Sequence, residues 1–398
     1  MIAGPAALAA VIAAATALAF WLEGRYRWAR NVGAALIAIL LGAALSNLGL
    51  VPVGSPVYEG IFGPVTSLAI AWLLISVRLD DLREAGPTML VAFLIGVTGT
   101  AIGALVGATV LAGAFGDEAW KLAGVTTGTY SGGSLNFVAV GRELGLPPSL
   151  FAAATAADNI VTAIWFGATL LLPLWLSRGE KEIADEPAGD RADRAVPTRS
   201  AMPDAIPEEP PGRTASSLPS IHEAPVLRVL DVTALFALGF TLIWAAGRLS
   251  AAVPAVPSVL WLTTLALAAG QIPAVRRLSG AMLLGTVALH LFFTLMGISS
   301  RVSEIASVGP QVLYLMAIVV GVHGLVLYGI GKLARLSPAT LSVASQAAIG
   351  GPTTAMAMAI ARRWPALILP GMAVGLLGYA VGNYLGFGIA YLTRALVG

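Results

Sequence analysis

The sequence feature that most constrains this chain is a pair of glycines in the middle of a long apolar segment. Segment 120–141 is long enough for a membrane helix, yet Gly132 and Gly133 stand between Ser131 and Ser134 near its centre. Each glycine weakens a helix by about 1 kcal/mol relative to alanine, so we predict a break there. Broken helices persist at membrane depth only where protein or a cavity surrounds the freed backbone groups.

A second break of the same kind is predicted far downstream. Segment 338–361 is also apolar, and Gly350 and Gly351 interrupt it just before Pro352. Interruptions at corresponding positions in two halves of a membrane protein are the best sequence pointer to a transporter's binding site. The two breaks therefore give the first indication of function.

The composition places most of this chain in a membrane. Hydrophobic residues make up 57% of the 398 residues and charged residues only 11%, whereas soluble domains carry about 25% charged residues. The chain has no cysteine, which excludes disulfides and thiolate chemistry. We predict an all-α polytopic membrane protein whose first apolar run is a retained helix, because no Lys or Arg precedes that run as in a signal peptide.

Apolar runs of about 20 residues match the hydrocarbon thickness of about 30 Å. They predict 11–12 transmembrane helices, at 4–22, 33–52, 60–77, 86–113, 120–141, 149–176, 229–250, 257–272, 281–298, 307–334, 338–361 and 366–394.

Basic residues in short loops predict the orientation, because cytoplasmic loops carry an excess of Lys and Arg. We assign the loops after the first, third and fifth runs to the cytoplasm and the N-terminus to the outside, on the basis of Arg25, Arg27, Arg30, Arg78, Arg83 and Arg142.

Residues 177–225 differ from the rest of the chain and divide it into two membrane halves, 1–176 and 226–398. This stretch holds 8 of the 24 prolines and 16 of the 44 charged residues, ten of them acidic. Such a composition cannot form a packed core. We interpret it as a disordered polar linker, and favour a tolerated insertion over a regulatory segment.

The two halves resemble each other in sequence pattern, since Gly132-Gly133 aligns with Gly350-Gly351 and Asn136 with Thr354. If every run crosses the membrane once, the halves are parallel repeats. If run 229–250 or 257–272 does not cross, they are inverted repeats. We favour the inverted arrangement, because it gives alternating access directly.

Polar side chains and glycines at the two breaks are the candidate substrate site. Helix N-termini offer N–H groups to an anion, while free carbonyls with Ser and Thr oxygens suit Na⁺. Any one hydroxyl taken alone more often bonds back to its own helix. The candidates are Thr127, Tyr130, Ser131, Gly132, Gly133, Ser134, Asn136, Gly350, Gly351, Thr353, Thr354 and Asn383.

Asp158 is the leading candidate for coupling to an ion. It lies within an apolar helix, where a carboxylate costs about 2.5–3.5 kcal/mol to insert. It can hold Na⁺ or cycle a proton; the alternative role is a capping or interhelical hydrogen bond. We expect no cofactor apart from a Na⁺ ion that Asp158 could hold. The predicted ion-coupling set is Asp158, Asn159, Asn136, Gln346 and Thr354.

Other chemistry has little support. His290 and His323 lie in apolar runs, where an interhelical hydrogen bond is the commoner role and proton relay the rarer one. Gly128, Gly132 and Gly133 do not follow a strand, as a dinucleotide fingerprint requires. No nucleophile–base pair accompanies Ser131. We expect neither an enzyme nor a nucleic-acid partner.

Four motifs resemble a known family. The runs GTYSGGSLNFVAV (128–140), AADN (156–159), HLFF (290–293) and GGPTTA (350–355) resemble the YjcL-like integral membrane proteins, classed as domain of unknown function 819. Their pattern is similar to the cation/proton antiporter and anion transporter group, which includes sodium/bile-acid-type symporters. The resemblance implies two inverted repeats, a crossed pair of broken helices, a core that moves against a panel, a homodimer and the bacterial inner membrane.

We therefore expect a secondary active transporter, coupled to Na⁺ or H⁺, that carries a small polar or anionic organic solute by alternating access. The alternative is a non-transporting membrane scaffold or sensor subunit whose linker recruits a partner.

Overall fold

The computed structural model describes residues 2, 4–52, 54–176 and 227–397, and within them every regular element is a helix. The predicted linker 177–225 lies outside these residues. Eight helices of this described part of the chain are long and apolar enough to cross a membrane. Helices α3 and α12 are shorter, and the runs with the glycine pairs are each split into two helices. The all-α polytopic membrane class is thus confirmed.

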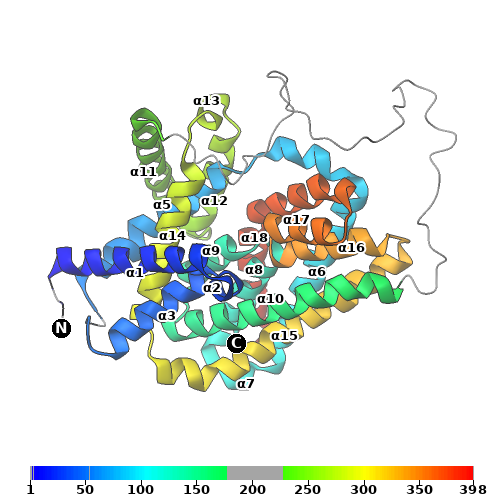
Figure 1. The fold of residues 1–398 in the computed structure, drawn as a ribbon, viewed down its shortest axis with the longest axis horizontal. Coiled ribbons are helices and arrows are strands. Elements are labelled where there is room, and N and C mark those ends of the chain that lie inside the picture. The colour runs from blue at the N-terminus through cyan, green and yellow to red at the C-terminus, as the bar shows by residue number, and fades with distance from the viewer. Residues whose placement is uncertain (1, 3, 53, 177–226, 398) are drawn as a thin grey trace, which may run out of the picture.

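Six helices form one group, which we call the scaffold bundle (Figure 1). Helices α3 and α14 pack tightly because Gly42 lies against the backbone of Thr294 and Gly297 against that of Ile39. Close backbone approach through small residues is the usual way that membrane helices associate. The scaffold bundle consists of α1 (Pro5–Arg25), α3 (Ala34–Asn47), α5 (Thr66–Ile75), α11 (Val229–Ala252), α12 (Ser258–Gly270) and α14 (Ala281–Ile298).

Eight further helices of the described residues form the hairpin bundle, which lies beside the scaffold bundle (Figure 1). It consists of α6 (Gly86–Val110), α8 (Ala119–Gly132), α9 (Ser134–Glu143), α10 (Pro148–Leu176), α15 (Val302–Leu333), α16 (Pro338–Ile349), α17 (Pro352–Ala361) and α18 (Ile368–Val397). Short helices connect these elements: α2 (Arg27–Val32), α4 (Pro56–Gly60), α7 (Ala112–Phe115) and α13 (Pro273–Arg276).

Helix α9 folds back along α8 after the break at Gly133. The Lys121 ammonium at the start of α8 donates to the Gly145 carbonyl just after α9, at 3.2 Å. Further in, Gly141 lies against Val125. We expected the run 120–141 to continue across the membrane as one interrupted helix. It forms instead a helical hairpin with the glycine pair at its tip.

The second broken run makes the same kind of hairpin. Helices α16 and α17 contact each other, and Val343 of α16 and Ala355 of α17 lie against the same residue of α18, Gly371. At the tip the Thr354 hydroxyl donates to the Gln346 carbonyl at 2.8 Å. Each predicted break is therefore the turn of a hairpin.

Helices α6 and α15 pack antiparallel through a line of small residues on α6. Gly99 lies against Val326, and Gly107 lies against Leu315. The contacted residue number on α15 falls as the number on α6 rises, so the two helices run in opposite directions. This pairing joins the two halves of the chain at the centre of the hairpin bundle.

The buried Trp72 of α5 joins the first half of the chain to α11 by donating its indole N–H to the Leu235 carbonyl at 2.9 Å. We predict that Trp72→Phe lowers the free energy of unfolding by about 1 kcal/mol, because the carbonyl loses its donor. Thermal unfolding in detergent measures this. Trp244→Phe is the control, since Trp244 is 68% exposed; equal melting of both variants would contradict the role of this bond.

Candidate functional site

The two hairpin tips have the same backbone conformation. Gly133 has φ 84° and ψ −171°, and Gly351 has φ 80° and ψ −166°. This region of backbone space is essentially restricted to glycine. In each hairpin the next helix begins at the following residue, Ser134 or Pro352. The alignment of the two glycine pairs predicted from sequence thus has a structural counterpart at the second glycine of each pair.

Helix α18 holds both tips against one line of glycines. A Cβ on Gly378 would overlap the Ser131 carbonyl at the first tip, and a Cβ on Gly375 would overlap the backbone of Pro352 at the second. The helix backbone therefore touches both hairpins directly. The line, spaced by three or four residues, consists of Gly371, Gly375, Gly378, Gly382 and Gly386.

Tyr379 of α18 lies between the two tips. A Cβ built on Gly133 would be 3.5 Å from its Cε1 atom, and one built on Gly351 would be 3.4 Å from its hydroxyl. Both tips therefore contact the same phenol ring. We did not predict Tyr379 from the sequence, but the glycine spacing around it was a signal that α18 closely approaches other backbones.

Several buried oxygens at the tips lack hydrogen-bond partners among the described residues. Asn136 is fully buried; its Nδ2 donates to the Gly378 carbonyl at 3.0 Å while its Oδ1 accepts nothing. The Ser131 hydroxyl is likewise buried without a partner. Gln346 donates to the Thr169 hydroxyl at 2.8 Å and keeps a free Oε1. Buried polar atoms are rarely unpaired in proteins, and neutral oxygens of this kind are ligands for hard cations.

Asp158 of α10 meets the first hairpin just before its tip. Thr162 donates to its Oδ1 at 3.1 Å, and its carboxylate interacts electrostatically with Tyr130. The phenol oxygen of Tyr130 is buried and makes no hydrogen bond of standard geometry. Asp158 itself retains some exposed surface. The structure thus brings the predicted carboxylate beside a predicted tip residue.

Three other predicted residues satisfy their polar groups locally. Thr127 donates its hydroxyl to the Ala123 carbonyl of its own helix at 2.8 Å. Asn159 donates its side-chain amide to the Thr155 carbonyl of its own helix, also at 2.8 Å. Thr354 bonds the Gln346 and Gly351 carbonyls, at 2.8 and 3.0 Å. These side chains stabilise the helices and the second tip.

Three more predicted residues lie in other surroundings: two are exposed, and the third, Asn383, is buried with an Oδ1 that has no hydrogen-bond partner among the described residues. Ser134, the first residue of α9, and Thr353, the second residue of α17, are exposed. Asn383 donates its amide to the Thr263 hydroxyl of α12 at 2.8 Å. It therefore joins the hairpin bundle to the scaffold bundle, and its position differs from that of Asn159, although both were predicted on matching helices.

The fully buried His323 of α15 connects the two hairpins. Its Nδ1 lies 2.8 Å from the Gly96 carbonyl and 3.0 Å from the Thr100 hydroxyl, and its Nε2 lies 2.9 Å from the Ser345 hydroxyl of α16. Thr100 in turn donates to the Tyr130 carbonyl of α8 at 3.0 Å. Since a carbonyl can only accept, Nδ1 carries a proton, and in the neutral imidazole Nε2 then accepts from the Ser345 hydroxyl.

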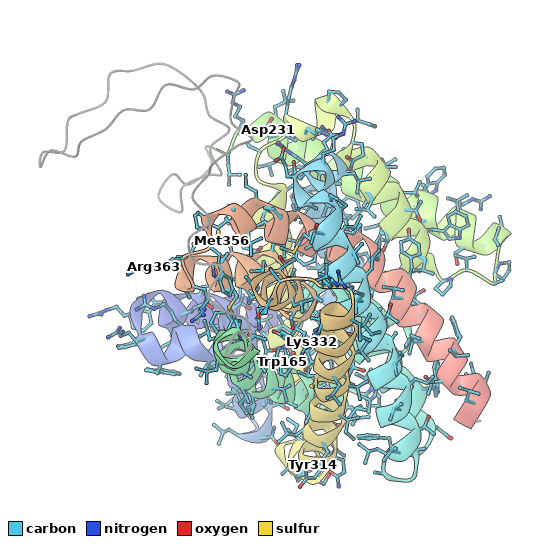
Figure 2. The ribbon with its side chains drawn as sticks, turned by 90° about the vertical axis from the view of Figure 1, so that its right-hand side faces the viewer. Trp165, Asp231, Tyr314, Lys332, Met356 and Arg363 are labelled. Atoms are coloured by element: carbon cyan, nitrogen blue, oxygen red, sulfur yellow. The ribbon has the colours of Figure 1, made fainter. Side chains whose placement is uncertain are left out.

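A second donor completes this network. The indole N–H of Trp165, labelled in Figure 2, donates to the Ser345 hydroxyl at 2.9 Å. His323 thus makes the interhelical bonds we predicted. His290 instead bonds the Thr286 carbonyl of its own helix through Nδ1 at 2.8 Å, and its ring lies tilted against that of Phe20, with the ring centroids 4.4 Å apart.

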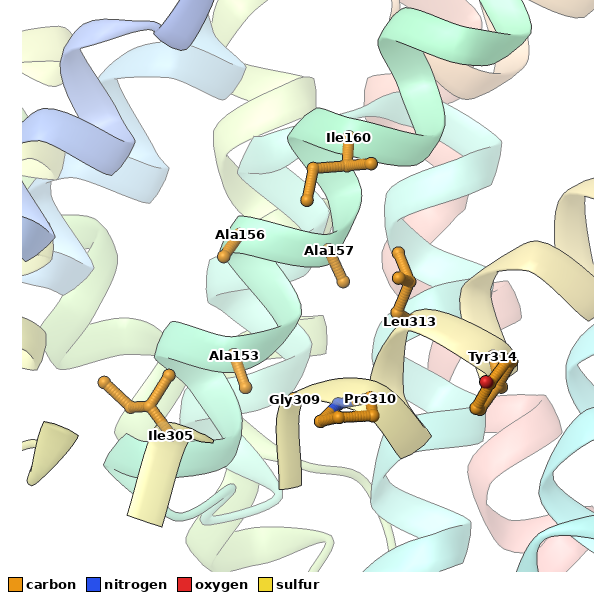
Figure 3. A pocket seen from close by; sticks show the side chains of 9 residues that line it. All are labelled: Ala153, Ala156, Ala157, Ile160, Ile305, Gly309, Pro310, Leu313 and Tyr314. Carbon is orange, nitrogen blue, oxygen red and sulfur yellow. The ribbon is translucent and has the colours of Figure 1, made fainter. Parts of the chain in front are cut away.

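A cavity of about 290 Å³ lies between α10 and α15 (Figure 3). Its lining is almost wholly apolar and contains no charged side chain, so it does not suit an ion or a polar solute. Ala156 and Ala157, next to Asp158 in sequence, line it. The remaining lining residues are Ala153, Ile160, Ile305, Gly309, Pro310, Leu313 and Tyr314.

The fold and the paired tips define an all-α polytopic membrane protein with two helical hairpins whose tips contact one helix, α18. A family model described as "Protein of unknown function (DUF819)" matches residues 10–396, and the chain belongs to that family. It is similar to the "Uncharacterized membrane protein YjcL" of Bacillus subtilis (strain 168), at 30% identity over 390 residues that cover 94% of this chain and 93% of that protein.

We predict that Gly382→Ala disrupts the first tip. A Cβ there would overlap the amide of Asn136, and such overpacking costs about 1–3 kcal/mol. Thermal unfolding measures the loss. The matched control is Gly388→Ala on the same helix, which has no neighbour within 4 Å and should leave stability unchanged or raise it by up to about 1 kcal/mol. Similar melting of the two variants would contradict the packing described.

Proposed function

We propose that this protein is a secondary active transporter, coupled to Na⁺ or H⁺, for a small polar or anionic organic solute. The observation that carries the proposal is the meeting of two glycine tips around Tyr379, beside buried oxygens that lack partners. Helix breaks in matching positions are where transporters of known architecture bind their solutes and ions.

The packing supports inverted repeats in this proposal. Helices α6 and α15, which occupy matching positions in the two halves, run antiparallel, as inverted repeats require. If each hairpin enters and leaves the membrane on its own side without crossing, ten helices cross the membrane. Matching elements of the two halves are then five crossings apart. An odd number of crossings inverts the second half, so α11 and α12 can both cross.

The charge distribution agrees with this topology. Arg362 and Arg363, which follow α17, then lie on the same side as Arg25, Arg78 and Arg276. We place this basic side in the cytoplasm of a bacterial inner membrane and the N-terminus outside, following the excess of Lys and Arg in cytoplasmic loops. One earlier assignment changes, since Arg142 at the end of the first hairpin then lies on the outer side.

Asp158 is the residue we assign to coupling in this proposal. A carboxylate inside a membrane protein marks an ion or proton path more often than a structural bond. Its neighbour Tyr130 belongs to the hairpin that carries Ser131 and Asn136, so an ion bound there would contact the arms that hold the solute. Sodium or a proton would then stabilise the loaded site.

We predict that Asp158→Asn lowers the rate of cation-dependent solute uptake in proteoliposomes by more than tenfold, while the protein still folds. Thermal unfolding tests the coupling role without a known substrate. In a screen of organic anions with and without Na⁺, some combinations of anion and Na⁺ should raise the melting temperature of the native protein but not that of Asp158→Asn. Ligand at 100 times its Kd stabilises by about 2.7 kcal/mol.

The control for this experiment is Glu84→Gln, which removes an exposed carboxylate far from the tips in sequence. It should respond to ions as the native protein does. Uptake by Asp158→Asn at the native rate would refute the coupling role, and the absence of any ion- or solute-dependent stabilisation would favour a scaffold or sensor subunit.

A further inference from the structure

The two hairpins differ in how they meet the scaffold bundle, although their tips match. Every residue from Leu135 to Gly141 on the second arm of the first hairpin, α9, is buried. On the matching arm α17, Thr353, Ala357 and Ile360 are exposed, Ile360 by 57%. These three residues recur at the spacing that puts them on one face of a helix.

The exposed face of α17 corresponds to a docked face of α9. Counting from Gly133 and Gly351, the matching residues are Leu135, Ala139 and Arg142, of which Leu135 and Ala139 are 4% and 1% exposed. Helix α9 contacts α5 and α12 of the scaffold bundle, whereas the main contacts of α17 among the described residues are with α16, α18 and residues 365–367. One arm is docked and its counterpart is not.

Two polar side chains fasten the docked arm. The Arg142 guanidinium donates to the hydroxyl of Ser67, in the first turn of α5, at 2.8 Å. Glu143 accepts from the backbone N–H and the hydroxyl of Ser258, at 2.9 and 3.0 Å. The second interaction satisfies a free N–H group at the start of α12. The end of α9 is thus bonded to two scaffold helices at once.

These bonds have no equivalent on the other hairpin. By the same counting, Arg142 and Glu143 correspond to Ile360 and Ala361, neither of which carries a polar group on its side chain. At these two positions the second arm can therefore meet the scaffold bundle only by apolar packing. Helices α14 and α3 are the scaffold helices that match α5 and α12 in chain order, and they are the surface that α17 would cover.

We infer that Arg142 and Glu143 form a latch that closes one face of the molecule while the α17 face stays open to water, and that releasing the latch lets α17 dock on α3 and α14. This inference rests on the proposed transport function, because it names the segment that closes each side of the site. In the orientation proposed above, the structure is open toward the cytoplasm.

The absence of cysteine allows a direct test in the full-length protein. Single variants A139C and A357C are exposed to a membrane-impermeant maleimide in membranes opened so that both faces are reached. A357C should react at least about tenfold faster than A139C. Resistance of A357C to this reagent, together with reaction to a lipid-soluble one, would show that the α17 face meets lipid and would overturn the inference.

The latch itself is tested by combining each cysteine with Glu143→Gln. Loss of one charge-assisted hydrogen bond is expected to shift the docking equilibrium by about tenfold, so A139C should react faster and A357C more slowly. Ser258→Ala is a milder second variant with the same expected direction. The control is Glu118→Gln, since Glu118 pairs with Lys121 of the first hairpin at 2.9 Å and does not bridge the bundles.

Opposite changes at the two cysteines support the latch, and parallel changes or none refute it. The transport proposal can fail separately. If labelling switches as expected but no solute or ion stabilises the protein, the latch stands and the transport function falls. If ligands stabilise the protein but Glu143→Gln leaves both labelling rates unchanged, transport stands and the latch falls.

Discussion

Direct contact between the backbone of α18 and both hairpin tips is the constraint on which this structure depends. Neither tip can satisfy its interrupted backbone alone, and lipid offers no hydrogen bonds. The line of glycines on α18 lets both tips approach one helix closely enough for the Asn136 amide to reach the Gly378 carbonyl. A single larger residue in this line would separate the two halves of the site.

The location of the breaks could be predicted from the sequence, but their shape could not. Gly-Gly pairs within apolar runs report local weakness of a helix, and the structure has non-helical glycines at those places. Whether the chain then continues or turns back depends on contacts such as Gly141 with Val125, which the sequence does not reveal. In the proposed topology each hairpin enters and leaves on one side of the membrane, so each half has one crossing fewer than its apolar runs suggest.

The same limit applies to the polar residues. Asp158 and Asn136 stand out because a polar group in an apolar run is costly, and they lie at the first tip. Thr127 looked equivalent but bonds its own helix, since a threonine can satisfy its hydroxyl locally. Tyr379 was not predicted because a single tyrosine inside an apolar helix gives no sign of what it contacts. Its role comes from two distant glycines that it contacts.

The dependence of both tips on α18 also bears on how the protein assembles. The first hairpin is synthesised well before α18, which follows all the other described helices in the chain. Until α18 arrives, Asn136 lacks the Gly378 carbonyl as a partner and the first tip lacks the surface that covers it. The first half of the chain must therefore wait in the membrane with an incomplete hairpin, and biogenesis of the site is a late event that completes both halves together.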